Sequence, residues 1–92
     1  MTAEINRDIQ RKRLLYRATH RGTKEADAIV GGFVKANIEI LDGAQLDALE
    51  DLLNRPDADI MDWLRGRRPM PVDQTWHLMQ LLKAYQQRLL TD

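Results

Sequence analysis

The stretch Ala26-Asp27-Ala28-Ile29-Val30-Gly31-Gly32-Phe33-Val34 carries the clearest structural signal in the chain. Its apolar residues recur at positions i, i+3, i+4, i+7 and i+8, which is the spacing of a helix that buries one stripe in a core. Those residues are Ala26, Ile29, Val30, Phe33 and Val34. Gly31 and Gly32 lie inside this helix, and each costs about 1 kcal/mol relative to alanine. Either a close helix crossing offsets that cost, or the helix frays toward its C-terminal end.

Helical patterns also precede and follow this stretch. Residues 3–17 predict a first helix, in which one face carries Ile5, Ile9 and Tyr16 while Leu14 and Leu15 lie off it. Residues 37–41 carry no apolar stripe and predict an irregular connection. The next helix has a buried stripe made of Leu46, Leu49, Leu52 and Leu53. Its expected start is a capping box between Asp42 and Gln45.

Two more helices are expected in the last third of the chain. Pro56 suits the first position of a short helix, and Gly66 is a natural stop for it. The inward residues of that helix are Ile60, Trp63 and Leu64. The segment from Arg67 to Pro71 predicts an extended loop. Asp73 then caps the last helix, whose shared face comprises Leu78, Leu82, Tyr85 and Leu89. We therefore expect an all-α fold, with residues 1–92 forming one helical domain, a single compact bundle of about five helices.

Composition narrows the classes of function. The 92 residues contain no cysteine, which excludes disulfides and thiolate metal sites. No run approaches the roughly 18 apolar residues of a membrane span, and no secretory leader is evident, so we expect a bacterial cytoplasmic protein without direct membrane insertion. The net charge is zero, with a basic start, an acidic middle and a basic end. A neutral total argues against a general nucleic-acid binder, whereas the charge blocks either support oriented docking or neutralise one another across the folded surface.

The segment Arg21-Gly22-Thr23-Lys24-Glu25 joins the first two helices and is the main candidate site. If the backbone is helical or turn-like here, Arg21 and Glu25 lie side by side at i, i+4. Gly22 exposes bare backbone to a partner, so the three residues form a plausible docking surface. The structural alternative is that Gly22 only caps the junction, Glu25 satisfies backbone donors and Arg21 is a solvated cation.

The residues around this segment follow a distinctive order. The run Arg11-Lys12-Arg13-Leu14-Leu15-Tyr16 precedes it, and Asp27 and Phe33 follow it. Farther on, a proline- and aspartate-containing stretch at residues 53–59 leads to Asp62-Trp63-Leu64. This order resembles the SdhE family of succinate dehydrogenase flavinylation factors, whose signature is R-G-x-x-E. The resemblance covers roughly residues 7–64, and this chain departs from it at Thr23 and Ala26, where many members have larger apolar residues.

The resemblance implies an assembly factor that is not itself an enzyme. Members of that family bind the flavoprotein subunit of succinate dehydrogenase, and sometimes that of fumarate reductase, and promote covalent attachment of FAD to a histidine of that subunit. FAD would thus be bound by the partner, and the chain would have no cofactor of its own. Carried over to this sequence, the partner-binding residues are Arg21, Gly22 and Glu25, flanked by Arg17, His20 and Asp27.

Two other classes of function compete with this interpretation. A small helical nucleic-acid-binding regulator would use the basic residues between Arg7 and Arg17, but the acidic middle of the chain opposes it. A small enzyme would use Glu25, Asp27 and His20, but the sequence offers no evident enclosed pocket or nucleophile. A second basic cluster, Arg65, Arg67 and Arg68, either contacts the partner or forms a solvated loop, and the solvated loop is the favoured interpretation. Trp63 and Trp76 are interpreted as packing residues.

Overall fold

The computed structural model describes the backbone of residues 3–91 and the side chains of residues 6–90. The described residues form α1 (Ala3–Thr19), α2 (Lys24–Ala26), the π-helical segment η1 (Asp27–Gly31), α3 (Gly32–Asn37), α4 (Gly43–Leu53), α5 (Asp57–Leu64) and α6 (Trp76–Thr91). Because α2, η1 and α3 follow one another without a break, they make one helix, and the described part of the chain is a bundle of five helices without strands. The all-α prediction is confirmed. None of these helices combines the length and the hydropathy required to cross a membrane.

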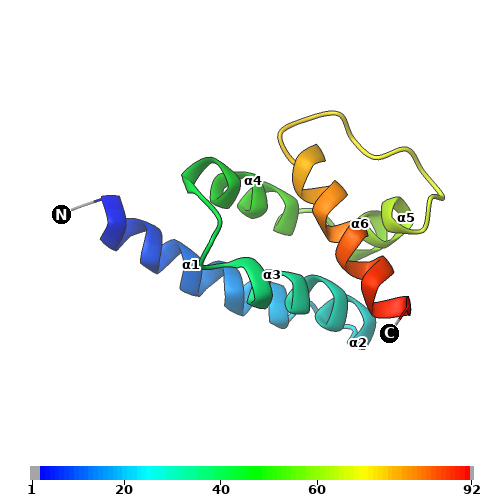
Figure 1. Cartoon of the computed structure of the whole chain (residues 1–92), viewed down its shortest axis with the longest axis horizontal. Helices are drawn as coiled ribbons and strands as arrows, with labels where there is room; N and C mark the ends of the chain where they lie inside the picture. The colour runs from blue at the N-terminus through cyan, green and yellow to red at the C-terminus, as the bar shows by residue number, and fades with distance from the viewer. Residues whose placement is uncertain (1–2, 92) are drawn as a thin grey trace.

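The first two helices form an antiparallel hairpin, which Figure 1 shows at the bottom of the molecule. They approach so closely at Gly31 that a Cβ atom there would lie 3.0 Å from the carbonyl oxygen of Ala18. A Cβ atom on Gly32 would meet the Tyr85 hydroxyl of α6, which is the far end of a side chain. Close crossing of the two backbones therefore explains Gly31, and the alternative of a frayed helix end is wrong because the helix continues to Asn37. The π-helical turns of η1 lie at this crossing. Such π-helical bulges are often found in functional regions of proteins.

The buried face of α1 differs from the expected one. Leu14 and Ala18 are almost fully buried, whereas Ile9 and Tyr16 are 50% and 64% exposed. Packing against η1 requires the small Ala18 at the crossing, and this rotates the Ile9 side of α1 toward solvent. The side chain of Ile5 lies outside the described residues. The prediction that Leu14 lies off the principal face is therefore wrong.

The buried polar side chain on α1 joins it to α4. Gln10 is 8% exposed and donates hydrogen bonds to the carboxylates of Asp47, at 3.0 Å, and Glu50, at 3.2 Å. Arg7 donates to Asp47 at 2.8 Å. The hydrogen bond from Arg7, followed by the one from Gln10, lowers the pKa of the Asp47 carboxyl. α1 is therefore held to α4 by a polar network at its solvent edge as well as by apolar packing.

The expected helix ends are largely confirmed. Asp42 and Gln45 form a reciprocal capping box at α4, with hydrogen bonds of 2.8 and 2.9 Å. Pro56 is the N-cap of α5, so the helix begins at Asp57, one position after the start that the sequence predicted at Pro56. Gly66 follows the C-cap of α5 with φ +75°, a conformation that glycine adopts without steric cost. The buried stripes predicted for α4 and α5 are confirmed, with every member below 10% exposure.

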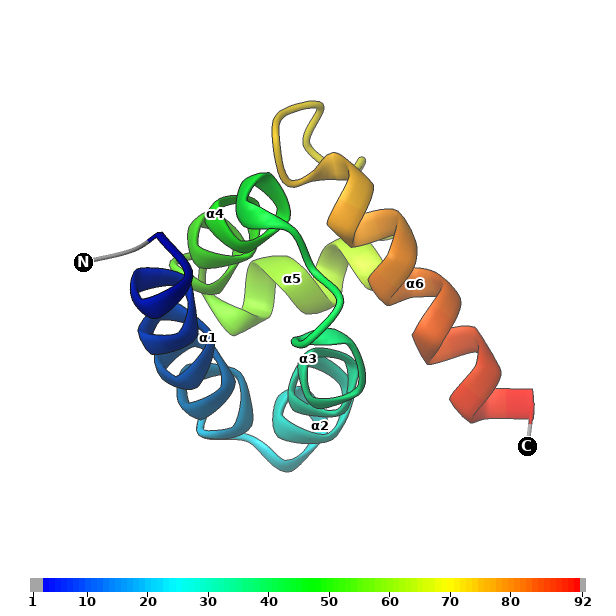
Figure 2. The ribbon, with the colours of Figure 1, turned by 60° about the vertical axis from the view of Figure 1, so that its left-hand side comes forward.

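The last helix covers one side of the bundle, and its final turns extend away from the other helices (Figure 2). Leu78 and Leu82 are buried as expected, and Tyr85 packs against the core from the surface. Leu89 is 48% exposed, so its expected place on the buried face is wrong because no helix lies beneath that part of α6. Asp73 accepts hydrogen bonds from the backbone N–H and the hydroxyl of Thr75, which is the residue immediately before α6.

Candidate functional site

Residues 20–23 form a sharp corner between α1 and α2. Gly22 has φ +108°, a backbone region that residues with a side chain rarely adopt, and a Cβ atom there would meet nothing within 4 Å. Thr23 is extended and caps α2, because its hydroxyl accepts a hydrogen bond from the Ala26 backbone N–H at 3.1 Å. Glycine at position 22 is therefore required by backbone conformation, and it leaves open space in front of the corner.

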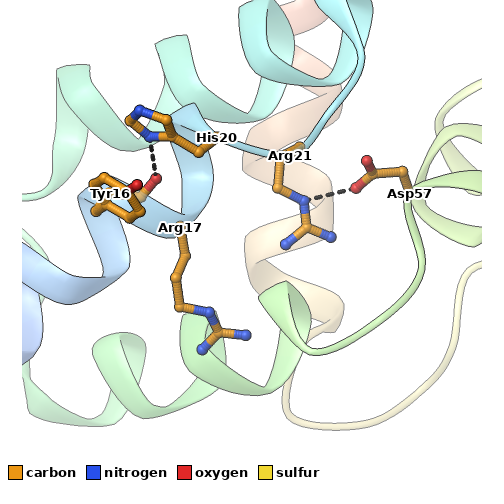
Figure 3. Close-up of a pocket in the computed structure, with 5 residues that line it drawn as sticks. All are labelled: Tyr16, Arg17, His20, Arg21 and Asp57. Carbon is orange, nitrogen blue, oxygen red and sulfur yellow. Dashed lines mark hydrogen bonds and ion pairs between the residues drawn. The ribbon is translucent and has the colours of Figure 1, made fainter.

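Arg21 points inward from this corner toward the junction of α4 and α5. Its Nε donates to the Asp57 carboxylate at 2.6 Å, and its two terminal nitrogens donate to the carbonyl oxygens of Leu53, at 2.6 Å, and Arg55, at 2.8 Å. Figure 3 shows the guanidinium directed at Asp57. Only 9% of the Arg21 side chain is exposed. The guanidinium thus satisfies two carbonyls that the end of α4 leaves without helical donors, and the interpretation of Arg21 as a solvated cation is wrong.

Glu25 points to the opposite end of α5. Its carboxylate forms an ion pair and hydrogen bond with Arg65, the C-cap residue of α5, and its side chain remains 54% exposed. The expected side-by-side arrangement of Arg21 and Glu25 is wrong, because α2 begins only after Thr23 and Arg21 lies before the corner. Arg21 instead attaches the corner to the start of α5 and Glu25 attaches α2 to its end, while the Glu25 carboxylate reaches solvent as predicted.

Asp27 stabilises the corner from within. One of its carboxylate oxygens accepts a hydrogen bond of 2.6 Å from the backbone N–H of Arg21, across the turn that Gly22 makes. A carboxylate in the first turns of a helix also interacts favourably with the positive end of the helix dipole. Asp27 therefore helps to set the shape of the corner.

Arg17 and His20 line an open hollow beside the corner, together with Tyr16, Arg21 and Asp57 (Figure 3). Its volume is about 350 Å³. The His20 ring stacks on Tyr16 with centroids 3.9 Å apart, and its Nδ1 lies 2.8 Å from the Tyr16 carbonyl oxygen. Arg17 donates to the Asn54 side chain at 2.6 Å. His20 is exposed, as expected for a surface histidine, and its ring is held in place by Tyr16.

Sequence reasoning missed three residues of this site. Asp57 and Arg65 are the partners of the two charged motif residues, from which they are separated by 36 and 40 positions. Nothing in the local pattern identifies a partner at that separation. Tyr16 is the third, and its signal was available, since an exposed aromatic ring next to the motif is a typical binding residue.

The arrangement is suited to binding a protein surface. It offers an exposed carboxylate, a bare backbone corner, and a fixed aromatic and histidine pair beside an arginine. Among the residues that the structure describes, no three histidine or acidic side chains come together as metal ligands.

Comparisons with known proteins place the chain in a family. The family model described as "Flavinator of succinate dehydrogenase" matches residues 12–86. The FAD assembly factor SdhE of Acetobacter pasteurianus is 41% identical over 78 residues, which cover 85% of this chain and 72% of that protein. Mitochondrial succinate dehydrogenase assembly factors 2 from Mycosarcoma maydis and Dictyostelium discoideum are 38% and 33% identical, over 71% and 89% of this chain.

The chain spans only 27% and 62% of the lengths of these two mitochondrial relatives. No solved structure matches the chain significantly. The family match covers most of the chain and includes the whole corner between α1 and α2, and the bacterial relative aligns over most of both proteins. The chain therefore belongs to the family of succinate dehydrogenase flavinators, the SdhE-type FAD assembly factors.

Proposed function

We propose that this chain binds the flavoprotein subunit of succinate dehydrogenase and promotes covalent attachment of FAD to it. Family membership supports this proposal, since the relatives are named as flavinators and assembly factors. In this role the chain is not an enzyme and has no cofactor of its own, because FAD is bound by the partner. The place of action is the bacterial cytoplasm. The flavoprotein of fumarate reductase is a second partner for the same surface.

The exposed corner is the observation that carries the proposed binding site. Among the six residues expected to contact the partner, the polar groups of Arg21 and Asp27 are engaged within the chain. They act as positioning residues, which hold the corner in one shape before binding. Gly22 and Glu25 are exposed, and we assign them the direct contacts: close approach of the partner to the Gly22 backbone, and hydrogen bonding to the Glu25 carboxylate.

Arg17 and His20 extend the contact surface along α1. Both line the hollow next to the corner, and Figure 3 shows the His20 ring beside Tyr16 and the Arg17 side chain below it. The rigid surface biases the partner toward the conformation in which its reacting histidine and FAD are correctly oriented. Binding energy is thus used to select a conformation of the flavoprotein.

Co-expression with the flavoprotein subunit tests this function. The denatured flavoprotein band is examined for covalent flavin fluorescence, with the wild-type chain, with no chain, and with Glu25→Gln. The matched control is Glu39→Gln, another exposed carboxylate, at the other end of the α2–η1–α3 helix and about 20 Å away. We expect bright bands with the wild type and Glu39→Gln, and weak bands with Glu25→Gln or without the chain. Equal fluorescence in all four samples would refute the proposed function.

A second comparison separates the Glu25 carboxylate from its ion pair. Arg65→Ala removes the partner of Glu25 but leaves the carboxylate in place, and an exposed pair of this kind contributes only about 0–1 kcal/mol to stability. If Glu25 acts on the flavoprotein, Arg65→Ala keeps most of the flavin attachment that Glu25→Gln loses. Equal losses for both variants would show that the ion pair, and not a direct contact, is what matters.

The structure weakens the case for a nucleic-acid-binding regulator. Its candidate helix, α1, has two arginines engaged with other parts of the chain: Arg7 with Asp47, and Arg11 with the carbonyl oxygens of Ile38 and Leu41. Groups held in this way are less available to phosphates. Binding of the chain to duplex DNA that falls steeply with salt and persists in Gly22→Arg would favour this alternative.

A further inference from the structure

The loop between α5 and α6 forms a second hollow with the first half of α6, which we call the basic hollow. Its lining includes Trp63, Arg67, Arg68, Met70, Trp76 and Lys83. Its volume is about 530 Å³, larger than that of the hollow beside the corner. None of its lining residues is acidic. The sequence singled out both its arginines and its tryptophans, and the proposed function uses none of them.

The floor of the basic hollow is fixed before any partner binds. Trp63 is 9% exposed, and two guanidinium groups lie within cation–π distance of its ring centroid. They are those of Arg55, at 5.7 Å, and Arg68, at 5.4 Å. Arg68 is also held by an ion pair of 2.6 Å with Asp59. Met70 packs against the core, so the loop is attached at this point. A surface ordered in advance loses less entropy on binding.

Two cations at the rim remain available to a partner. The Arg67 side chain is 69% exposed, and its only ion pair with a described residue is a long one of 3.9 Å with Asp62. Lys83 forms no hydrogen bond or ion pair within the described residues. Beside them, Trp76 is 45% exposed. Arginine and tryptophan are enriched in the energetic centres of protein interfaces, and a half-exposed tryptophan that lines the same hollow as these two cations fits such a centre.

The basic hollow adjoins the proposed docking corner. Arg65 contacts Glu25, and the next residue, Gly66, lines the basic hollow. A protein that covers the Glu25 side of α2 therefore meets this loop without a large gap. Because its floor and one wall are aromatic and apolar, the hollow fits a peptide with an apolar side chain better than it fits a nucleic-acid backbone.

We propose that the basic hollow is a second docking surface, which binds an acidic segment of the flavoprotein partner and seats one large apolar side chain of that segment against Trp76. Arg67 and Lys83 pair with the acidic residues, and Trp63, held by Arg68, forms the floor. This inference rests on the proposed function, since it concerns the same partner, but it assigns a surface separate from the corner.

The test measures binding of the purified flavoprotein subunit to the full chain at low and at high ionic strength. The first variant combines Arg67→Glu with Lys83→Glu, and the second is Trp76→Ala. The matched control combines Lys12→Glu with Arg13→Glu, two exposed cations of α1, a helix that Figure 2 shows on the opposite side of the bundle from α6. Hydrogen exchange of residues 66–75 is followed with and without the flavoprotein.

We expect the Arg67 and Lys83 reversal to weaken binding about tenfold at low ionic strength and less at high ionic strength, because exposed charges are screened by salt. Trp76→Ala should weaken binding by a similar factor of about ten at both ionic strengths. The control should bind as the wild type does, and the flavoprotein should slow exchange in residues 66–75.

Several outcomes would overturn the inference. Wild-type affinity for both variants, with binding abolished by Gly22→Arg, would remove the basic hollow and leave the proposed function intact. A wild-type chain that does not bind the flavoprotein at all would overturn both. Binding of single-stranded RNA to the wild type that is lost on reversal of Arg67 and Lys83 would show that the hollow serves a nucleic acid instead.

Discussion

The contacts of Arg21 lead to a prediction about stability that separates a structural role from a direct role in docking. Arg21→Ala removes the guanidinium that holds the corner against the α4–α5 junction. It leaves the Asp57 carboxylate without its ion-pair partner, and the carbonyl oxygens of Leu53 and Arg55 without their donors. The fold itself should persist, because the apolar stripes of all five helices are unchanged.

The size of the effect follows from the burial of the pair. Breaking a buried ion pair by removing one partner costs about 3–5 kcal/mol. Here Arg21 is 9% exposed and Asp57 is 22% exposed, and Asp57 also lies in the first turn of α5, where the helix dipole favours a negative charge. The lower end of the range therefore applies, about 3 kcal/mol. For a domain of this size that corresponds to a fall of about 12–24 °C in Tm.

Urea unfolding followed by far-UV circular dichroism measures this change. The series comprises Arg21→Ala, Arg21→Lys, Asp57→Asn and the double variant of positions 21 and 57, with Arg13→Ala as an exposed control. Lysine keeps the charge but not the planar fork, so Arg21→Lys should recover only part of the loss. The double-mutant cycle should give a coupling of about 1–3 kcal/mol, and the control should change stability by less than about 0.5 kcal/mol.

An Arg21→Ala variant that unfolds at the same urea concentration as Arg13→Ala would refute this reasoning. Arg21 would then have to be regarded as a docking residue, whose inward position in the free chain contributes no stability. If the predicted loss is observed, flavin attachment with Arg21→Ala must be compared with that of the wild type at a temperature at which the variant is folded.

Three further perturbations test individual features of the fold. Gly31→Ala should lower the free energy of unfolding by about 1–2 kcal/mol in urea, because its Cβ would lie 3.0 Å from the Ala18 carbonyl oxygen, and a gain in stability would contradict the close crossing. Gly22→Ala should cost about 1 kcal/mol in the same assay through backbone strain alone, since φ is +108° and no atom lies within 4 Å; a neutral result would mean that the corner relaxes. Hydrogen bonds from Thr75, and a further one from Arg55, lower the pKa of Asp73 from 3.8 to about 2. A lowered folded-state pKa adds stability that is present above pH 3.8 and lost as the pH falls toward 2, so Asp73→Asn should show a smaller loss of Tm over that interval, and parallel curves for variant and wild type would contradict the assignment.

Local patterns predicted most of the helices because helices depend on local interactions. The apolar stripe of residues 26–34, the capping box of Asp42 and the stop at Gly66 each involve residues within a few positions of one another. They appeared where the sequence placed them, to within one or two residues. The exception was the buried face of α1, where five basic residues and a sparse apolar stripe pointed to the face of Ile9 and Tyr16, whereas packing against Gly31 buried the face that carries Leu14.

The candidate site was predicted as a set of residues and not as a geometry. Arg21 and Gly22 lie in one corner, and Glu25 follows it in the first turn of α2, where it is exposed as expected. The relation between them was wrong, because an i, i+4 pair requires continuous helix and the chain turns at Gly22. Whether the six residues contact a flavoprotein stays a prediction.

The sequence by itself determined that this chain is helical, where its helices begin and end, and that a glycine separates the first two of them. These properties follow from apolar spacing, capping residues and backbone preferences that act over a few positions. Only the tertiary structure decided that Arg21 turns inward and that Glu25 meets Arg65. The groups that direct those side chains lie 36 and 40 positions away. They reach the corner only when α5 packs beside it, so no local pattern contains them.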